Sequence, residues 1–194
     1  TSNQCDDKMK YIFESNFYVK YQAPNADELI KKIDTYTDDS IDNAQFTWGE
    51  KSCSDKIPLK WQDYMELLTP SVKLFAKEFN VYFNFILNDP WINFYKRGDH
   101  QEVHDHHGNH LSSLFVANDG EGFSTFYFID RHSHGMIDTV SKVINYNPSY
   151  NVKLKAGDII FFPSYLMHGV SPHKSDIIRK TLSFNFDIKD VEKQ

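Results

Sequence analysis

The stretch Asp99-His-Gln-Glu-Val-His-Asp-His-His-Gly-Asn-His110 contains five of the nine histidines of the chain. Side chains at alternate positions of a β-strand point to the same face of a sheet. If this stretch is a strand, His104 and His106 face one common point. Imidazole is a ligand for iron, zinc, copper and nickel, so the pair is a candidate metal site.

A third ligand has to come from another strand, and the sequence offers one. The stretch Gly157-Asp-Ile-Ile-Phe-Phe-Pro-Ser-Tyr-Leu-Met-His168 contains an apolar run and places His168 shortly after Pro163. Three protein ligands leave coordination positions open for a substrate. We therefore expect His104, His106 and His168 to bind one metal ion, with iron(II) as the preferred metal.

Strand parity alone leaves other interpretations open. His100 and Glu102 share the face of His104 in a regular strand, and Glu102 with two histidines would form the two-His-one-carboxylate site of non-haem iron oxygenases. Asp105 points to the opposite face unless a bulge intervenes. The stretch can also be a histidine-rich surface loop that binds nothing, with His168 a hydrogen-bonded core residue.

Around the histidines, the second half of the chain is a series of short apolar runs separated by Gly, Asn, Asp and Pro. This pattern favours a β-sandwich or barrel. The expected strands are Trp91–Tyr95, Leu111–Ala117, Phe123–Ile129, Val152–Leu154, Ile159–Phe162 and Thr181–Ile188. The polar connection 131–150 is long enough to border a binding site, although we expect its His132 and His134 to be solvated.

The first half of the chain is predicted to be more helical. Helices are expected near Ala26–Tyr36, over Lys60–Leu68, and after Thr69-Pro70, which is typical of an N-cap followed by a first-turn proline. The other segments are predicted to be short strands at Tyr11–Phe13 and Phe17–Tyr21, an irregular polar region over 37–58 apart from Phe46–Trp48, and a helix or strand at Val81–Leu87.

Composition limits the possible classes of function. The 194 residues fit one domain, with a helical half at about 1–88 packing on a core at about 89–188. The net charge of −6 disfavours nucleic-acid binding. The sequence contains no apolar run of about 18 residues, the length that a membrane-spanning helix needs. Thr1–Lys10 carries no signal-peptide pattern. Cys5 and Cys53 are expected to be free thiols in a reducing cytoplasm.

Four blocks of sequence carry a resemblance to a known family. They are Trp91-x-Asn93-x-Tyr95-x-x-Gly98-Asp99-x-Gln101-x-x-His104-x-His106, Leu111-Ser112, Gly157-Asp158-x-x-x-Phe162-Pro163-Ser164-x-x-x-His168-x-Val170 and Arg179-x-Thr181-x-Ser183-Phe184-Asn185. In this order and spacing they resemble the 2-oxoglutarate- and Fe(II)-dependent oxygenases, and specifically a branch found in phages and marine bacteria. The resemblance implies a mainly β fold with flanking helices, namely a cupin-like jelly roll, or double-stranded β-helix, with the metal between its two sheets.

The resemblance also implies which residues bind the metal. His104 matches the first ligand of the family and His168 matches the distal one. The wider superfamily usually has Asp or Glu two residues after the first histidine, where this chain has His106. Three neutral imidazoles leave iron(II) with its full charge, which the dianionic co-substrate 2-oxoglutarate can compensate when it chelates the metal.

The fourth block offers a site for the far carboxylate of 2-oxoglutarate. Arginine presents a planar, permanently charged fork that suits a carboxylate, and Arg179 shares a strand face with Thr181. A surface salt bridge is the alternative role for Arg179. Further contacts to the co-substrate are expected from Tyr95, whose alternative is core packing, and from three neighbouring polar residues, Asn93, Ser183 and Asn185.

The sequence thus predicts an enzyme, a 2-oxoglutarate-dependent dioxygenase that uses Fe(II) and O₂. We expect it to hydroxylate an amino acid or a peptidyl residue such as proline, releasing succinate and CO₂, in the cytoplasm (of the host if a phage encodes it). Nucleobase substrates are disfavoured by the charge, and no membrane partner is expected. The alternatives are a three-His cupin-type dioxygenase that needs no 2-oxoglutarate, and a non-catalytic metal-binding jelly-roll module.

Overall fold

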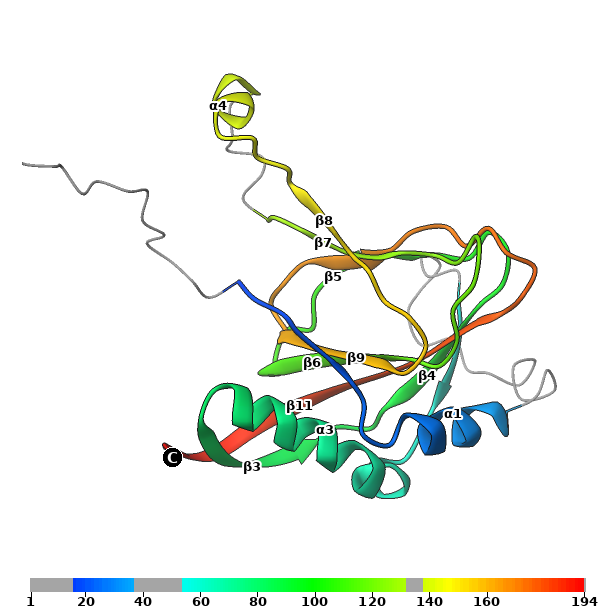
Figure 1. Cartoon of the computed structure of the whole chain (residues 1–194), viewed down its shortest axis with the longest axis vertical. Helices are drawn as coiled ribbons and strands as arrows, with labels where there is room; N and C mark the ends of the chain where they lie inside the picture. Colours follow the sequence, from blue (N-terminus) through cyan, green and yellow to red (C-terminus); the bar gives the residue numbers. More distant parts are fainter. Residues whose placement is uncertain (1–15, 37–53, 132–137, 194) are drawn as a thin grey trace, which may run out of the picture.

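The computed structural model describes residues 16–36, 54–131 and 138–193, which form two antiparallel sheets that face each other (Figure 1). The larger sheet has the order β1 (Val19–Gln22), β9 (Asp158–Pro163), β6 (Leu111–Val116), β11 (Arg179–Lys193), β4 (Trp91–Tyr95) and β2 (Asp55–Pro58), and β3 (Val81–Leu87) also pairs with β11. The smaller sheet has the order β5 (Gln101–His104), β10 (His168–Val170), β7 (Phe126–Ile129) and β8 (Ser149–Val152).

The chain passes back and forth between the two sheets. From β4 onward the larger sheet receives β4, β6, β9 and β11, and the smaller sheet receives β5, β7, β8 and β10 in between. This alternation is the winding of a double-stranded β-helix, so the predicted jelly roll is confirmed. It also places β5 and β10, the strands with His104 and His168, next to each other in the smaller sheet.

Alternating side chains divide the larger sheet into an inner and an outer face. Ile160 and Phe162 of β9 point inward and pack against Phe126 and Val170 of the smaller sheet. Phe161, which lies between them, points outward, and its ring centroid is 5.5 Å from that of Phe75 on the covering helix described next. Strands β6 and β9 are buried along their whole length, which explains the continuous apolar run Ile159–Phe162 in β9.

Two helices cover the outer face of the larger sheet, as Figure 1 shows. They are α1 (Ala26–Asp34) and α3 (Met65–Glu78), and α3 follows a short 3₁₀ turn, η1 (Trp61–Asp63). The predicted helix start at Thr69-Pro70 is wrong, because α3 runs through both residues. Pro70 removes one helical hydrogen bond, but the buried stripe of Leu68, Val72 and Phe75 holds the helix on the sheet.

Two further strands come from the first half of the chain. Val81–Leu87, which periodicity left ambiguous, is strand β3. The prediction that 37–58 is irregular is wrong at its end, because Asp55–Pro58 forms the edge strand β2 beside β4. Only four residues long, β2 is fixed by pairing with its neighbour and gives little periodic signal of its own.

The connection between β7 and β8 carries the small helix α4 (Asp138–Val143) at its outer tip (Figure 1). The strand predicted at Val152–Leu154 lies earlier in the chain, because β8 runs over Ser149–Val152 and pairs with β7 from Ile129 to Phe126. None of the helices in the described ranges is long and apolar enough to span a membrane. The predictions that concern Tyr11–Phe13, Phe46–Trp48, Cys5, Cys53, His132 and His134 fall outside the described residues.

Candidate metal centre

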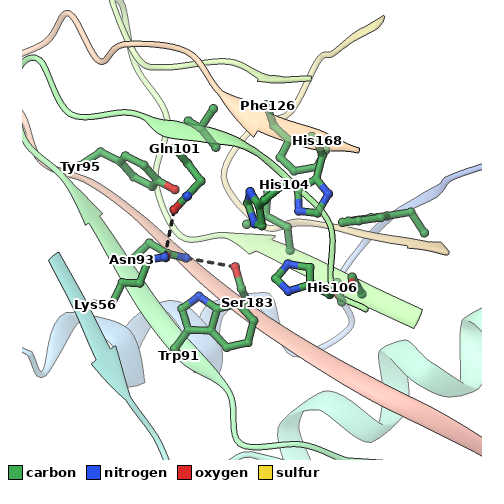
Figure 2. A pocket seen from close by; sticks show the side chains of 15 residues that line it. Lys56, Trp91, Asn93, Tyr95, Gln101, His104, His106, Phe126, His168 and Ser183 are labelled. Carbon is green, nitrogen blue, oxygen red and sulfur yellow. Dashed lines mark hydrogen bonds between the residues drawn. The ribbon is translucent and has the colours of Figure 1, made fainter. Parts of the chain in front are cut away.

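Three histidines converge between the sheets (Figure 2). His104 ends β5 and pairs directly with His168, the first residue of β10. His106 follows just beyond β5, where its backbone N–H donates to the carbonyl of Ser164 at 2.9 Å. One ring nitrogen from each histidine lies within 4.8 Å of the other two, a spacing that can hold a metal ion.

Backbone carbonyls orient two of the rings. The Nδ1 atoms of His104 and His168 each lie 2.8 Å from a carbonyl oxygen, that of Glu102 and that of Leu166. A protonated Nδ1 that donates to a carbonyl leaves the lone pair on Nε2, which is the arrangement in which metal-binding histidines are found. The donor set of three imidazoles therefore fits a first-row transition metal such as iron(II).

Burial keeps these histidines neutral. Desolvation, together with the nearby His104 and Lys56, lowers the pKa of His106 to about 4. Desolvation also lowers the pKa of His104 and, more strongly, that of His168. A metal ligand has to be deprotonated, and at neutral pH all three rings meet that requirement without loss of a proton.

The carboxylates considered as alternative ligands lie elsewhere. Asp105 forms an ion pair with Arg131 and lies 3.3 Å from Nδ1 of His107. Glu102 has an exposed side chain. Within the described ranges, the cluster able to hold a metal consists of histidines alone. The buried His173, in contrast, accepts from the backbone N–H of Ser124 and has its other nitrogen near a carbonyl, as in a structural histidine.

Opposite the histidines, the inner face of the larger sheet is polar. Asn93 of β4 donates from Nδ2 to Thr181 Oγ1 at 3.2 Å and to Ser183 Oγ at 3.1 Å, both on β11. Farther along β11, Asn185 Oδ1 accepts from Ser112 Oγ at 2.8 Å. The polar residues predicted on one face of the two strands are therefore brought together across the cavity from the histidines.

Arg179 and Tyr95 form a buried pair at the far end of this row. The Arg179 guanidinium carbon lies 5.2 Å from the centroid of the Tyr95 ring, and the residue is 3% exposed. Among the described residues, its Nη1 atom has no hydrogen-bond partner, and burial lowers its pKa. A buried cation with an unsatisfied donor is costly, so the pair fits an anionic ligand.

The cavities show how these residues are separated. A small inner cavity of about 40 Å³ is lined by the three histidines, Asn93 and Tyr95. Arg179 lies on a neighbouring cavity of about 250 Å³, and Phe126 lines both. An outer cavity of about 500 Å³, which includes Asn185, shares Lys56, Trp91 and His106 with the inner cavity.

Three residues that line the inner cavity were not predicted to be functional, namely Lys56, Gln101 and Trp91. Lys56 of β2 is buried and donates from Nζ to Gln101 Oε1 at 2.9 Å, and Trp91 lies 5.7 Å from His106 between ring centroids. Trp91 could have been found, because it shares a strand face with Asn93. Lys56 gave no signal because its strand was not predicted.

Comparisons with known proteins agree with this geometry. Residues 89–185, half of the chain, match the sequence profile of a family described as "Putative 2OG-Fe(II) oxygenase". A search of curated proteins finds no match. The fold resembles the non-heme alpha ketoglutarate dependent epimerase SnoN from nogalamycin biosynthesis, with a TM-score of 0.64 and 14% identity over 93% of this chain and 79% of that one.

Two other solved structures share the fold. One is an oxidoreductase of the 2OG-Fe(II) oxygenase family from Burkholderia pseudomallei, with a TM-score of 0.62 and 12% identity over 88% of this chain and 84% of that one. The other is HygX from Streptomyces hygroscopicus with nickel and 2-oxoglutarate bound, with a TM-score of 0.56 and 11% identity over 91% of this chain and 85% of that one. At these identities the likeness concerns the fold.

Proposed function

The chain belongs to the 2-oxoglutarate- and Fe(II)-dependent oxygenases, and on this premise we propose that His104, His106 and His168 hold its iron(II). The observation that carries this proposal is the convergence of three neutral ring nitrogens within 4.8 Å beside a cavity. Iron(II), when bound with 2-oxoglutarate, supplies the oxidising chemistry with O₂, in which the co-substrate becomes succinate and CO₂.

The proposed anchor for 2-oxoglutarate is the buried pair of Arg179 and Tyr95, with Thr181 beside them on β11. The unsatisfied Nη1 of Arg179 supports this role, because a carboxylate accepts from a guanidinium in a strong, charge-assisted hydrogen bond. HygX, which shares the fold, binds 2-oxoglutarate together with nickel. In this proposal Asn93, Ser183 and Asn185 line the path between the anchor and the substrate and hydrogen-bond to the bound molecules.

The proposed reaction is the hydroxylation of an amino acid or of a peptidyl residue such as proline. The outer cavity of about 500 Å³ is open to such a group, and its volume lies in the range of small-molecule sites. His106 and Trp91 line both this cavity and the inner one, so a substrate in the outer cavity would lie against the metal ligands. The rings of Trp91 and Phe126 form apolar parts of the wall of the inner cavity.

Anaerobic titration of the purified chain with Fe(II) and then 2-oxoglutarate tests the proposal. A visible metal-to-ligand charge-transfer band is expected when 2-oxoglutarate chelates the iron, followed by succinate formation on admission of O₂. His168→Ala should lose the band, whereas His173→Asn, which changes a buried histidine outside the cluster, should keep it if folded. No band and no succinate in the wild-type protein would contradict the proposal.

Arg179→Met separates the proposal from a three-His dioxygenase that needs no co-substrate. The variant should still bind iron(II) but lose turnover of 2-oxoglutarate, because a neutral side chain cannot pair with the far carboxylate. Oxidation that survives in the variant would favour the co-substrate-free enzyme. We further propose that residues 1–194 act as one oxygenase domain; its location in the cytoplasm and its membership of a phage branch stay predictions from the sequence.

A further inference from the structure

Ser124 is a buried serine whose hydroxyl group the proposed function leaves unused. It is 7% exposed, and within the described part of the chain its Oγ atom has no hydrogen-bond partner. Such a group is costly to bury, so it is usually paired in a folded protein. Ser124 lines the cavity of about 250 Å³ on which Arg179 lies. The unsatisfied hydroxyl therefore belongs to the same cavity as the unsatisfied Nη1 of Arg179.

The side chain of Ser124 points between the two sheets. The pairing of β7 with β10 continues one residue before Phe126, where the backbone N–H of Ser171 donates to the Thr125 carbonyl at 2.9 Å. Residues two apart in an extended strand share a face. The ring of Phe126 packs inside the molecule, 5.6 Å from that of Phe162 between centroids. Ser124 is therefore directed toward the same interior as Phe126.

Phe126 lies at the boundary between the metal site and Arg179. It lines both the inner cavity and the cavity of Arg179. Its ring centroid lies 5.4 Å from that of His168, and Figure 2 shows the two side chains next to each other. The inner cavity of about 40 Å³ has room for only about three water molecules, which is too little for 2-oxoglutarate. A co-substrate that chelates the metal therefore has to extend past Phe126 into the cavity of Arg179 and Ser124.

The charges around this cavity favour a carboxylate at Arg179. Among the described residues that line it, Arg179, Lys153 and Asp119 carry formal charges at neutral pH. Lys153 and Asp119 are exposed, whereas Arg179 is 3% exposed, so solvent and salt screen the charge of Arg179 least. A carboxylate has two oxygens that accept hydrogen bonds. The guanidinium of Arg179 can donate to one of them and the hydroxyl of Ser124 to the other.

We propose that Ser124 is a second anchor for the far carboxylate of 2-oxoglutarate, which is held between Arg179 of the larger sheet and Ser124 beside the smaller one. The inference rests on the proposed function and adds to it a binding residue that determines co-substrate specificity. The Ser124 hydroxyl donates to the far carboxylate and to no other part of the co-substrate. It therefore favours a 2-oxo acid with a second carboxylate over one that ends in an alkyl group.

Binding to a redox-inert form tests this proposal without relying on turnover. The protein is loaded with Zn(II) and titrated calorimetrically with 2-oxoglutarate. The affinity for 2-oxopentanoate, which has a methyl group in place of the far carboxylate, is measured by displacement. Ser124→Ala should weaken 2-oxoglutarate by about tenfold or more, because a hydrogen bond to a charged group is lost. The same variant should bind 2-oxopentanoate as the wild-type protein does.

Two further variants separate anchoring from a structural role. Ser71→Ala is the matched control, because Ser71 is a buried serine of α3 whose Oγ also lacks a partner among the described residues. It should keep the wild-type affinity for 2-oxoglutarate. Ser124→Cys carries a weaker donor, so its affinity should lie between those of the wild type and Ser124→Ala, and it replaces the alanine variant if that does not fold. The affinity for Zn(II) should be unchanged in all three variants, because the histidines are untouched.

Two results would overturn the proposal. One is an unchanged affinity for 2-oxoglutarate in folded Ser124→Ala. The other is an equal weakening of both 2-oxo acids, which would mean that the substitution disturbs the metal end of the site. The Fe(II) and 2-oxoglutarate titration of the wild-type protein separates this inference from the proposed function. A charge-transfer band together with an unchanged affinity in Ser124→Ala refutes the inference alone, whereas no band refutes the proposed function.

Discussion

Asp105 and His106 are neighbours in the chain, yet their side chains meet different surroundings. The Asp105 carboxylate pairs with Arg131 at the rim of the outer cavity, while the His106 ring lies 5.1 Å from that of His168 between centroids. The polypeptide thus directs its carboxylate outward and its imidazole inward. Because 2-oxoglutarate brings two negative charges, a neutral ligand set remains compatible with iron(II).

Substitution of His106 and of Asp105 in turn shows which of the two residues binds the metal. His106→Ala should weaken Zn(II) or Fe(II) binding by more than about 100-fold, since loss of even an outer-shell partner costs about 10–100-fold. Asp105→Asn is the matched control and should stay within about tenfold of the wild-type affinity. Competition with a chromophoric chelator measures both constants. The opposite ranking would identify Asp105 as the ligand and His106 as its neighbour.

The metal-free protein should lose stability in acid through the same residues. Burial lowers the pKa of His106 from 6.5 to about 4 and lowers those of His104 and His168. Between these pH values the unfolded chain binds more protons than the folded one, so the free energy of unfolding falls as the pH decreases from 6.5 toward 4. Thermal unfolding near pH 7 and near pH 5 measures the effect. His106→Asn should show a smaller decrease, and an equal decrease would contradict this assignment.

Single residues differ in how well the sequence predicts them. The expected convergence of His104 and His106 is met, but not by alternation along one strand, because β5 ends at His104 and His106 lies beyond it. The proximity of Arg179 to Tyr95 follows once β11 and β4 pair. Lys56 and Gln101 could not be found in this way, because their contact joins two different sheets and no local pattern encodes it.

At the scale of elements, α3 shows how packing overrides a local signal. Thr69-Pro70 is a typical helix start, but Thr69 Oγ1 instead bonds to the carbonyl of Met65 inside the helix at 2.7 Å. Phe75 from the same helix contacts the outer face of the sheet at Phe161 and Phe186. Tertiary burial of this face outweighs one missing helical hydrogen bond, and the sequence alone cannot weigh these two terms.

Truncation of the central aromatic of α3 should measure that packing. Phe75→Ala is expected to lower the free energy of unfolding by about 3–5 kcal/mol, the usual cost of removing a buried aromatic ring, because Phe75 is 4% exposed. Phe79→Ala removes a ring that is 44% exposed in the same region and should cost clearly less. Chemical denaturation of both variants gives the values. Equal losses would mean that α3 is not anchored through Phe75.

The whole molecule divides the proposed site between its two sheets. His104 and His168 come from the smaller sheet, and Arg179 with Tyr95 comes from the larger one. This division could be predicted from the family resemblance, because strand order in a jelly roll alternates between sheets. The contribution of β2 to the larger sheet was not foreseen, and the segment that forms β3 was left open as a helix or a strand, because its apolar run fits both.

In the proposed site, metal and 2-oxoglutarate contact residues of different sheets, so they should stabilise the molecule in two separable steps. Zn(II) bound by the histidines would link β5 to β10, and it should raise the melting temperature even without 2-oxoglutarate. 2-Oxoglutarate, bound to the metal and to Arg179, then joins the smaller sheet to β11, and at a concentration 100-fold above its Kd it should add about 2.7 kcal/mol.

Arg179→Met tests this linkage in the intact protein. The variant should keep the increase in melting temperature caused by Zn(II) and lose the further increase caused by 2-oxoglutarate, because the metal ligands are untouched while the far carboxylate has no cation. Arg97→Met, which changes an exposed arginine paired with Asp176, should keep both increases. If Arg179→Met keeps the second increase, 2-oxoglutarate is held by the metal and by groups other than Arg179, and its binding does not link the two sheets through β11.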